Sequence, residues 1–492
     1  MPQLAPSFPL PIGLDPGSPT PLYRQLAEWF RQAILAGRLH PGQRVPSTRR
    51  LADELKVSRI PVLGAYEQLL AEGYLESFIG AGTCVARAIP GESLRRVAGK
   101  SRKAAPAAHR RGARRTSRRS AAMPVLEQPW LKNLGAFRIG LPAVDRFPMG
   151  IWAQLVNRHV RRQALEVMGY GGPLGYLPLR AAIADYLSAM RAVKCDAEQI
   201  MVTTGSQQGL QLSAQVLLDA GDEAWVEEPG YLGARQALLA VGAKPVSVPV
   251  DTEGLRVADG IRRGRDAHAV YITPSHQFPL GMTMSAARRM SLLNWATESG
   301  AWIIEDDYDS EYRFGGRPVA SLQGMDPDER VIYVGTFSKV MFPALRVGYV
   351  VIPKDLVPSF AVARDAGDTF SSSLHQLVMA DFIGEGHFAR HTRRMRTLYM
   401  ERRTALVEAI AAELPGQLEV VGGETGMHLV ALLPPGVDDI AVTRAAAARG
   451  VSVRPLSQCY IRAPKRGGLI LGFGGAASRD IPEAIRRLKT CI

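Results

Sequence analysis

A dense cationic stretch is the feature that most limits how this chain can fold. From Arg87 to Arg119 it carries twelve Lys or Arg and one acid, Glu92, so it holds +11 of the chain's net charge of +14. The stretch is rich in Ala, Arg, Ser and Gly and has no apolar periodicity. Burial therefore cannot offset the entropy cost of ordering it. We expect a disordered linker here, with a separately folded domain on each side.

The predicted domain boundaries follow from this interruption. A small domain is expected at 18–87, a basic linker at 88–129 and a large domain at 130–492. Two roles for the linker stay open. It is either a solvated tether or a tether that also holds nucleic-acid phosphates, because a cationic run attracts a polyanion without sequence preference.

Composition excludes several classes of protein. Apolar residues make up 46% of the chain, which is enough to build substantial cores. The four cysteines lack metal-ligand spacing, which argues against a disulfide scaffold or zinc module and indicates a reducing cytoplasm. No apolar run approaches the ~20 residues of a membrane span, and the Pro-rich first residues lack the features of a secretory signal. We expect a cytoplasmic protein without membrane contact.

The segment 21–86 has the pattern of a small helical domain followed by a β-hairpin. Apolar residues recur at helical spacing from Leu22 to Ile34. Ser47 and Ser58 each precede another helical segment, and both are expected to be N-caps. The sequence YLESFIGAGTCVA then predicts two short strands around a Gly-rich tip. This order of elements predicts a winged helix-turn-helix, a DNA-binding fold.

Cationic and small residues occupy the positions where such a fold meets DNA. Four arginines lie near the second helix or at the start of the third, and a glycine in the wing permits close approach to a phosphate. The candidate DNA-binding residues are Arg44, Arg49, Arg50, Arg59 and Gly80.

This segment resembles the GntR-type DNA-binding domain. The resemblance rests on PLYRQLAEWFRQAILAGRLHPGQRVPSTRRLADELKVSR, AYEQLLAEGYL and the GAGT wing. It implies double-stranded DNA as a partner, with contacts from Arg49, Ser58, Arg59 and Gly80. The sequence departs from the family after the arginine, where Ile60-Pro61 replaces polar residues. Base recognition at that point is therefore expected to be apolar or reduced.

The large domain alternates apolar strand-like runs with helical segments. The runs include QIMVTTG, EAWVEEPG, AVYITPS, AWIIEDDYD and RVIYVGTFSK. This alternation predicts an α/β fold with a mostly parallel sheet covered by helices. Polar motifs follow several of these runs, and ligands in such folds bind at the carboxyl ends of the strands.

Two of the motifs are open to several interpretations. TTGSQQGL at 203–210 places a helix start after a strand, as phosphate-binding sites do, although many α/β turns share this pattern. IIEDDYDSEY at 303–312 carries five acids at or after the end of a strand. These acids could bind a metal ion, cap a helix, or place one carboxylate against a cationic ring nitrogen.

The motif GTFSKVMFPALRVGY at 335–349 is the most specific. Lys339 follows a buried strand, and an amine with a lowered pKa can form a Schiff base with an aldehyde there. Ser338 and Arg346 are placed to bind a dianionic phosphate. Together with the two preceding motifs, this pattern predicts bound pyridoxal 5'-phosphate.

The large domain resembles the fold-type I PLP-dependent aminotransferases. With the N-terminal domain, the chain resembles the MocR/GabR-type transcriptional regulators. The resemblance rests on GYGGPLGYLPLR, TTGSQQGL, EEPGYLGAR, TPSHQFPLG, EDDYDSEYR and TFSKVMFPALRVGY. It implies an aminotransferase-like domain with helices on both faces of the sheet, a homodimer, and no metal ion.

The resemblance also implies a role for each matching residue. Lys339 would form the Schiff base. Asp306 would pair with the pyridine nitrogen, with Asp307 and Asp309 as weaker candidates, and Tyr308 would bond the 3-hydroxyl. Tyr231 would stack on the ring. The implied phosphate ligands are Gly205, Ser206, Gln207, Ser338 and Arg346, with Tyr170 reaching the phosphate across the dimer interface.

Two departures from the aminotransferase pattern weigh against turnover. Phe278 stands where an aminotransferase has the asparagine that bonds the cofactor's oxygen, so Tyr308 is expected to make that contact alone. Ile470 stands where an arginine usually holds the substrate carboxylate. We expect a transcriptional regulator that senses pyridoxal phosphate itself or an amine or amino acid. The alternative is an active aminotransferase that carries a DNA-binding module.

Overall fold

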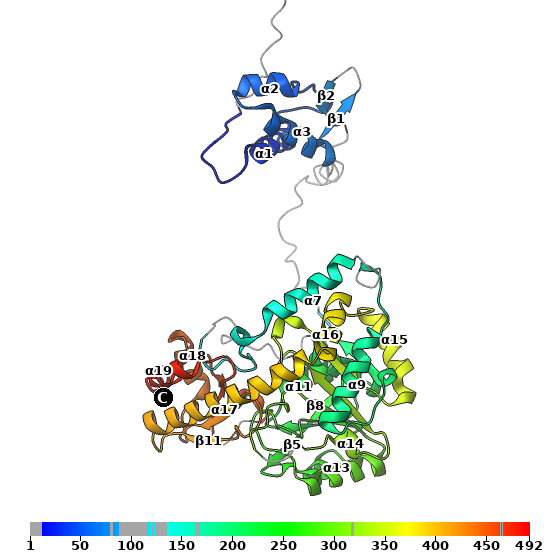
Figure 1. Ribbon diagram of the computed structural model, residues 1–492, viewed down its shortest axis with the longest axis vertical. Coiled ribbons are helices and arrows are strands. Elements are labelled where there is room, and N and C mark those ends of the chain that lie inside the picture. Colours follow the sequence, from blue (N-terminus) through cyan, green and yellow to red (C-terminus); the bar gives the residue numbers. More distant parts are fainter. Residues whose placement is uncertain are drawn as a thin grey trace, which may run out of the picture. The chain divides into compact units, whose positions relative to one another are not determined.

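The computed structural model describes most of the chain in two compact units. The units are Met1–Arg114 and Arg115–Ile492 (Figure 1). The described residues are 12–78, 82–87, 116–117, 119–120, 123, 135–162, 168–315, 319–462, 464 and 466–492. The predicted linker at 88–129 lies almost entirely outside them, so its role and the domain boundaries remain predictions. In the described part of the chain, no helix is long and apolar enough to span a membrane.

The first unit is the winged helix-turn-helix that the sequence predicts. Its elements are α1 (Leu22–Leu35), α2 (Thr48–Leu55), α3 (Arg59–Ala71), β1 (Leu75–Phe78) and β2 (Gly82–Val85). The two strands pair antiparallel. Phe30 is fully buried between the helices, and its ring meets that of Tyr66 edge-on at 5.6 Å between centroids. This core is separate from those of the second unit.

The two predicted N-caps differ. Ser47 caps α2, because its side chain accepts a hydrogen bond from the backbone N–H of Arg50. Ser58 is the N-cap residue of α3, but its side chain makes no capping hydrogen bond within the described structure. The predicted N-cap position of Ser58 is therefore confirmed, but its exposed hydroxyl is not committed to the helix.

The second unit contains an eight-stranded sheet in the order β3-β10-β9-β8-β7-β4-β5-β6. Strands β9, β8, β7, β4 and β5 run parallel, while β10 and β6 run antiparallel to their neighbours. The strands are β3 (Ile200–Thr203), β4 (Glu223–Glu228), β5 (Lys244–Asp251), β6 (Gly254–Leu255), β7 (Ala269–Ile272), β8 (Trp302–Asp307), β9 (Val331–Thr336) and β10 (Gly348–Val351). The predicted fold class, a mostly parallel α/β sheet, is confirmed.

Helices cover both faces of this sheet. Successive strand residues point to opposite faces, so Val270 and Ile303 pack against one set of helices while Tyr271 and Ile304 pack against another. The first set is α12 (Val257–Arg263), α13 (Ala286–Ser299) and α14 (Leu322–Met325). The second set is α10 (Ser206–Leu217), α11 (Leu232–Val241) and α15 (Val357–Gly367). Burial on both faces explains the near-continuous apolar runs in the sequence.

A second, antiparallel sheet follows in the order β11-β12-β14-β13. Its strands are β11 (Glu419–Val421), β12 (His428–Leu432), β13 (Arg454–Pro455) and β14 (Gly468–Gly472). The other α-helices of the described residues are α7 (Met149–Arg162), α9 (Leu177–Arg191), α16 (Ser373–Gly384), α17 (His387–Glu413), α18 (Asp439–Ala448) and α19 (Ile481–Lys489). Short 3-10 helices lie at Val144–Arg146, Ala197–Gln199, Pro343–Leu345, Lys354–Leu356, Ser457–Cys459 and Ser478–Asp480.

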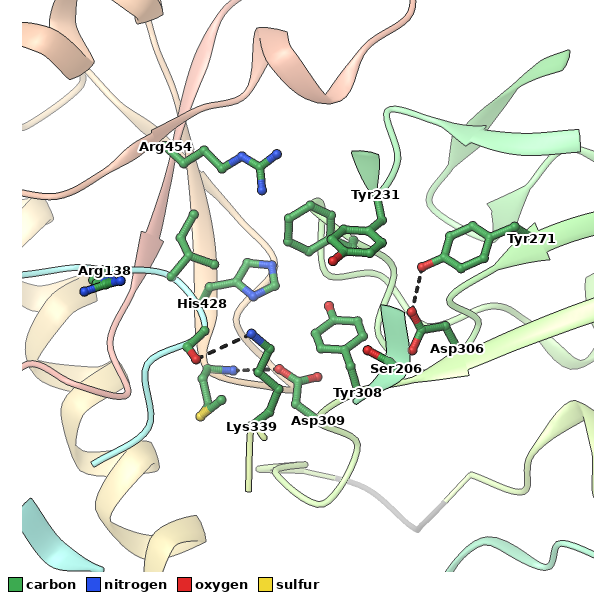
Figure 2. A pocket seen from close by; sticks show the side chains of 14 residues that line it. Arg138, Ser206, Tyr231, Tyr271, Asp306, Tyr308, Asp309, Lys339, His428 and Arg454 are labelled. Atoms are coloured by element: carbon green, nitrogen blue, oxygen red, sulfur yellow. Dashed lines mark hydrogen bonds between the residues drawn. The ribbon is translucent and has the colours of Figure 1, made fainter. Parts of the chain in front are cut away.

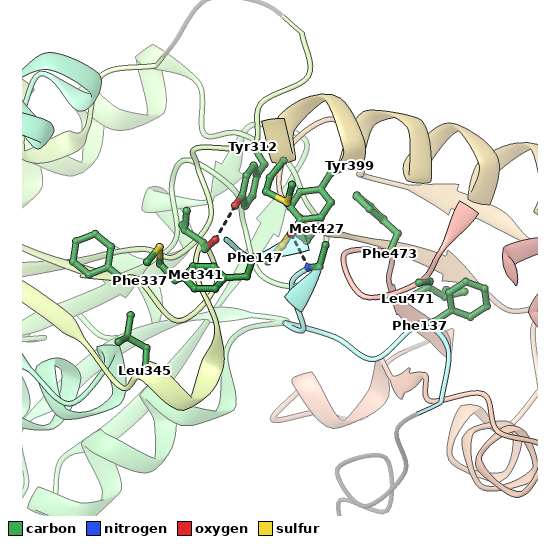
Figure 3. Close-up of a cluster of buried hydrophobic side chains, with 14 of the residues drawn as sticks. Phe137, Phe147, Tyr312, Phe337, Met341, Leu345, Tyr399, Met427, Leu471 and Phe473 are labelled. Carbon is green, nitrogen blue, oxygen red and sulfur yellow. Dashed lines mark hydrogen bonds between the residues drawn. The ribbon is translucent and has the colours of Figure 1, made fainter. Parts of the chain in front are cut away.

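One hydrophobic core joins the two sheets. Phe337 and Met341, from the turn after β9, share it with Leu471 of β14 and with Phe473, which directly follows that strand (Figure 3). The hydroxyl of Tyr312 donates to the carbonyl of Val340 at 3.3 Å within this core. The turn that carries Lys339 is therefore fixed on both sides by packed neighbours.

Candidate functional site

A cavity of about 260 Å³ opens at the carboxyl ends of the parallel strands. Figure 2 shows Arg138, His428 and Arg454 on one side and Tyr231, Tyr271 and Asp306 on the other. Lys339 lies between the two groups. The lining residues are Arg138, Ile139, Gly140, Ser206, Tyr231, Tyr271, Phe278, Asp306, Tyr308, Asp309, Lys339, Met427, His428 and Arg454. The topology thus brings the predicted motifs together, as expected for an α/β sheet.

Lys339 projects into this cavity from the turn after β9. Burial lowers the pKa of its amine, and the carboxylates of Asp309 and Asp306 oppose that shift. Its Nζ lies 3.5 Å from the carbonyl oxygen of Gly140. A side chain at Gly140 would collide with the amine, because a Cβ there would lie 2.3 Å from Nζ. A buried amine with a lowered pKa and free space before it is a nucleophile.

The acids at the end of β8 lie in different environments. Asp306 lines the cavity, where its Oδ2 accepts a hydrogen bond from the Tyr271 hydroxyl at 2.9 Å. Its Oδ1 is buried and has no hydrogen-bond partner among the described residues. Burial raises the pKa of Asp306 to about 7. The free oxygen makes Asp306 the carboxylate that could pair with a ligand cation.

Asp307 is directed away from the cavity and serves the fold. Its Oδ2 lies 2.8 Å from the guanidinium of Arg191 and accepts the Tyr333 hydroxyl at 2.7 Å. Burial alone would raise the pKa of Asp307, but Arg191 holds it below its usual value. Of the two acids, only Asp306 faces the space next to Lys339.

Tyr308 has a neighbour that the sequence did not indicate. Nδ1 of His276 lies 2.7 Å from Oδ1 of Asp309 and 3.0 Å from the Tyr308 hydroxyl oxygen. An ionised carboxylate only accepts hydrogen bonds, so Nδ1 must carry the hydrogen that it donates to Asp309. The Tyr308 oxygen therefore accepts from the same N–H, and its own hydrogen is free to point into the cavity. Burial raises the pKa of Tyr308 well above 10, so the phenol keeps that hydrogen.

One interpretation of the acidic motif was a metal site, and one cluster next to Tyr308 has the residue types for it. Ligand-type atoms of His276, Asp309 and His428 lie within 4.8 Å of one another. The carboxylate of Asp309 accepts from His276 and from the backbone N–H of Met427, and Nε2 of His428 lies 3.1 Å from the Pro279 carbonyl. We therefore assign this cluster to hydrogen bonding.

A basic, glycine-lined corner lies next to the start of α10. Gly205, the N-cap residue, has φ +95°, which only glycine adopts without strain. A Cβ at Gly205 would lie 3.0 Å from the guanidinium of Arg346, which donates to the Thr204 carbonyl at 2.6 Å. The hydroxyl of Ser338 is buried and has no partner in the described part of the chain. Helix N–H groups, a guanidinium and a free hydroxyl together form an anion site.

Two further residues were predicted to contact the cofactor, Tyr231 at its ring and Gln207 at its phosphate. Tyr231 lines the cavity, and its ring meets that of Phe278 edge-on at 5.7 Å between centroids. The side-chain amide of Gln207 donates to the Gly233 carbonyl at 2.8 Å. The amide of Gln207 is therefore used to hold the chain next to Tyr231.

Arg454 is a lining residue that the sequence analysis missed. Ile470, which stands in place of the usual arginine, is buried in β14. The antiparallel register places Arg454 directly opposite Ile470, and the Arg454 side chain lines the cavity with its guanidinium 5.7 Å from the Phe278 ring. A cation therefore lies in the cavity beside Ile470, although the usual arginine is absent at position 470. Only the strand pairing reveals it, because sixteen positions separate the two residues in the sequence.

Tyr170 does not line the cavity of its own chain. It is 95% exposed, and its ring meets only that of Phe370, at 5.9 Å, among the ring contacts of the described residues. Large apolar side chains nearby in the sequence are also exposed, namely Met168 at 78% and Leu177 at 56%.

The predicted DNA-binding residues lie on the helix-turn-helix. Arg44, Arg49, Ser58 and Arg59 are exposed. Arg50 is half-buried and bonds Glu54 at 2.9 Å, while Nε of Arg59 donates to the Thr48 hydroxyl at 3.1 Å. The predicted wing contact, Gly80, lies outside the described residues.

Comparison with known families matches both units. The family described as "Aminotransferase class I and II" matches residues 148–476, and "Bacterial regulatory proteins, gntR family" matches residues 22–85. The "Probable rhizopine catabolism regulatory protein MocR" of Rhizobium meliloti is 42% identical over 97% of this chain and 95% of its own. The "HTH-type pyridoxine biosynthesis transcriptional regulator PdxR" of Corynebacterium glutamicum is 35% identical over 94% of each chain.

Solved structures match the second unit. LysN, an alpha-aminoadipate aminotransferase from Thermus thermophilus, superposes with a TM-score of 0.71 and 28% identity, over 76% of this chain and 96% of LysN. A kynurenine aminotransferase from Pyrococcus horikoshii gives a TM-score of 0.70 and 29% identity, over 76% and 96% of the two chains. The first was solved with N-(5'-phosphopyridoxyl)-L-leucine and the second with PMP.

Proposed function

The chain belongs to the MocR-type regulators of the GntR family, and on this basis we propose a DNA-binding regulator that responds to pyridoxal 5'-phosphate or to an amine or amino acid that meets it. The winged helix-turn-helix would bind an operator. The aminotransferase-like domain would hold the cofactor on Lys339. The observation that carries this proposal is a buried amine of lowered pKa that faces an unpartnered carboxylate oxygen, in the same chain as a DNA-binding fold.

The residues of the cavity fit pyridoxal phosphate. The free Oδ1 of Asp306 suits a protonated ring nitrogen, and the ring of Tyr231 suits the face of an aromatic ligand. The Gly205 corner, with Ser206, Ser338 and Arg346, suits a phosphate. The cofactor would supply an aldehyde and an electron sink. The protein would hold the ring nitrogen protonated through Asp306 and direct the Tyr308 hydrogen at the 3-hydroxyl.

Arg454 supports an effector that carries a carboxylate. Its guanidinium lines the same cavity as Lys339, so it could hold the acid group of an amino acid whose amine meets the cofactor. This observation also favours the rival function, an aminotransferase with a DNA-binding module. Steady conversion of an amino donor and a keto acid would identify the rival, whereas a single half-reaction or none supports the regulator.

We further propose that the chain forms a homodimer. Tyr170 is almost fully exposed and does not line its own cavity. A second copy would cover this apolar surface and bring Tyr170 of the partner subunit to the phosphate corner. A dimer would also present two winged helices to a two-part operator.

The proposed function predicts that the cofactor changes operator affinity. Full-length protein selects its operator from a random duplex library, and Kd is then measured with and without pyridoxal phosphate and a panel of amines. We expect affinity to change by about 5- to 150-fold, equivalent to a coupling free energy of about 1–3 kcal/mol. Equal affinity under all conditions would overturn the sensing function.

Arg59→Ala separates the two activities in the same assay. We expect it to weaken operator binding by about 1–3 kcal/mol and to leave cofactor loading unchanged, because the two units have separate cores. Arg479→Ala is the matched control, since Arg479 is an exposed arginine of the second unit. Loss of cofactor colour in Arg59→Ala would contradict this separation.

The His276–Asp309 pair gives a spectroscopic prediction. Tyr308→Phe removes the hydrogen bond to the cofactor's oxygen, so we expect the bound cofactor's colour to change at a higher pH. Asp309 accepts from both His276 and the backbone N–H of Met427, whereas the asparagine of Asp309→Asn has only one side-chain oxygen. With that oxygen on Met427, the new amide N–H faces Nδ1 of His276, so Nδ1 loses its hydrogen and can accept from Tyr308 instead. The same upward shift is expected, and the double variant should add nothing to it. Fully additive shifts would show that Asp309 does not act through Tyr308.

A further inference from the structure

The first turn of α3 exposes apolar side chains where a DNA-binding helix usually carries polar ones. Ile60 is 80% exposed and Leu63 is 41% exposed, and both lie on the outer face of the helix. The inner face is formed by the buried residues Val62, Ala65, Tyr66 and Leu69. Ile60 and Leu63 therefore add nothing to the core of this unit. We call these two residues the apolar pair.

The surroundings of the apolar pair are cationic. Arg49, Lys56 and Arg59 are exposed on α2, on the turn and at the start of α3. The hydrogen bond from Arg59 to the Thr48 hydroxyl holds one of these cations beside Ile60. The nearest outward acid on α3 is Glu67, seven residues beyond Ile60. The exposed acids of α2 are Asp53 and Glu54, and Glu54 pairs with Arg50. An apolar pair next to exposed cations fits a polyanion that also presents apolar groups, which is the character of duplex DNA.

The chemistry of the pair narrows what it can contact. Neither side chain has a donor or an acceptor, so it cannot hydrogen-bond the edges of guanine, adenine or cytosine. Pro61, between them, lacks a backbone N–H as well. In the major groove only thymine presents a methyl group, at C5. Apolar contact with that methyl is the one base-specific interaction open to Ile60.

We propose that Ile60, supported by Leu63, contacts thymine methyl groups and makes each operator half-site depend on thymine. This inference rests on the proposed DNA-binding function and specifies the base that the helix selects. Arg59 would supply the polar part of recognition, and the surrounding cations would contact phosphates. The departure from the family pattern at Ile60-Pro61 then changes specificity rather than weakening it.

Uracil substitution tests the proposal one methyl group at a time. The operator is selected with full-length protein, and each thymine is then replaced by uracil, which lacks only the C5 methyl. We expect a loss of affinity of about fourfold at one or two thymines in each half-site, the factor that burial of one methyl group gives. In Ile60→Ala the same uracil substitutions should have no further effect.

Two control variants test whether the uracil effect depends on the Ile60 side chain itself. Ile60→Val retains branched methyl groups and should keep most of the uracil effect. Ile261→Ala alters an equally apolar residue, 42% exposed on α12, and should leave DNA binding unchanged. Because Ile60 is largely exposed, its variants should unfold at the wild-type temperature.

The outcomes distinguish this inference from the function on which it rests. If no duplex is enriched, both the DNA-binding function and the inference fall. If an operator is enriched but uracil costs nothing, or costs the same in Ile60→Ala, only the inference falls. A change in oligomeric state in Ile60→Ala, with operator specificity intact, would assign the apolar pair to protein contact and would also overturn it.

Discussion

Lys339→Ala should yield a colourless protein that borohydride cannot link to pyridoxal phosphate. The wild-type chain is expected to turn yellow with the cofactor and to be trapped at position 339. The reason is that the Lys339 amine is buried, has a lowered pKa, and projects into the cavity that holds Asp306 and Tyr308. Absorbance spectroscopy and mass spectrometry of the reduced, digested protein measure the result.

The same variant tests the link to DNA. Lys339→Ala should still bind the operator, because the winged helix-turn-helix has its own core, but its affinity should no longer respond to the cofactor. Lys354→Ala is the control, since Lys354 lies on the surface in an ion pair with Asp196 at 2.7 Å. Colour that persists in Lys339→Ala, with label on another lysine, would refute the assignment.

Asp306→Asn and Asp307→Asn should affect different properties of the protein, although the two acids are neighbours in the sequence. The first should weaken cofactor binding, and the second should destabilise the fold. Asp306→Asn should weaken cofactor binding by about 1.5–3 kcal/mol, the range for a hydrogen bond to a charged group. Asp307→Asn leaves the buried guanidinium of Arg191 without its counter-charge, so it should lower the free energy of unfolding by about 3–5 kcal/mol. Cofactor titration and denaturant unfolding measure the two effects.

The pH dependence of stability should also differ between Asp306 and Asp307, because their pKa values are shifted in opposite directions. The pKa of Asp307 is below its usual value, so its contribution to stability is present above the unfolded pKa and is lost as pH falls through the folded pKa. The pKa of Asp306 is raised to about 7, so its ionisation in the cofactor-free protein lowers stability as pH rises from about 4 toward 7. Cofactor-free Asp306→Asn should therefore gain stability relative to wild type over that interval. A parallel loss in both variants would show that both acids serve the fold.

The amino-acid sequence was enough to predict the main helices and strands and the chemical motifs. Helical spacing from Leu22 to Ile34 and the apolar runs of the second unit depend on local periodicity, which burial imposes on any helix or strand. The motif around Lys339 was sufficient to predict which lysine would react with the cofactor, and the structure places that amine in the cavity.

Which of several similar residues faces the cavity depends on the packing of distant segments, and the sequence did not show it. Asp306 and Asp307 are adjacent and chemically identical, and the pleat of β8 directs one toward the cavity and the other toward Arg191. The partners of Tyr308 come from separate segments, with His276 32 positions away. Arg454 joins the site through its register opposite Ile470. These contacts depend on strand pairing between distant segments, and local periodicity carries no information about that pairing.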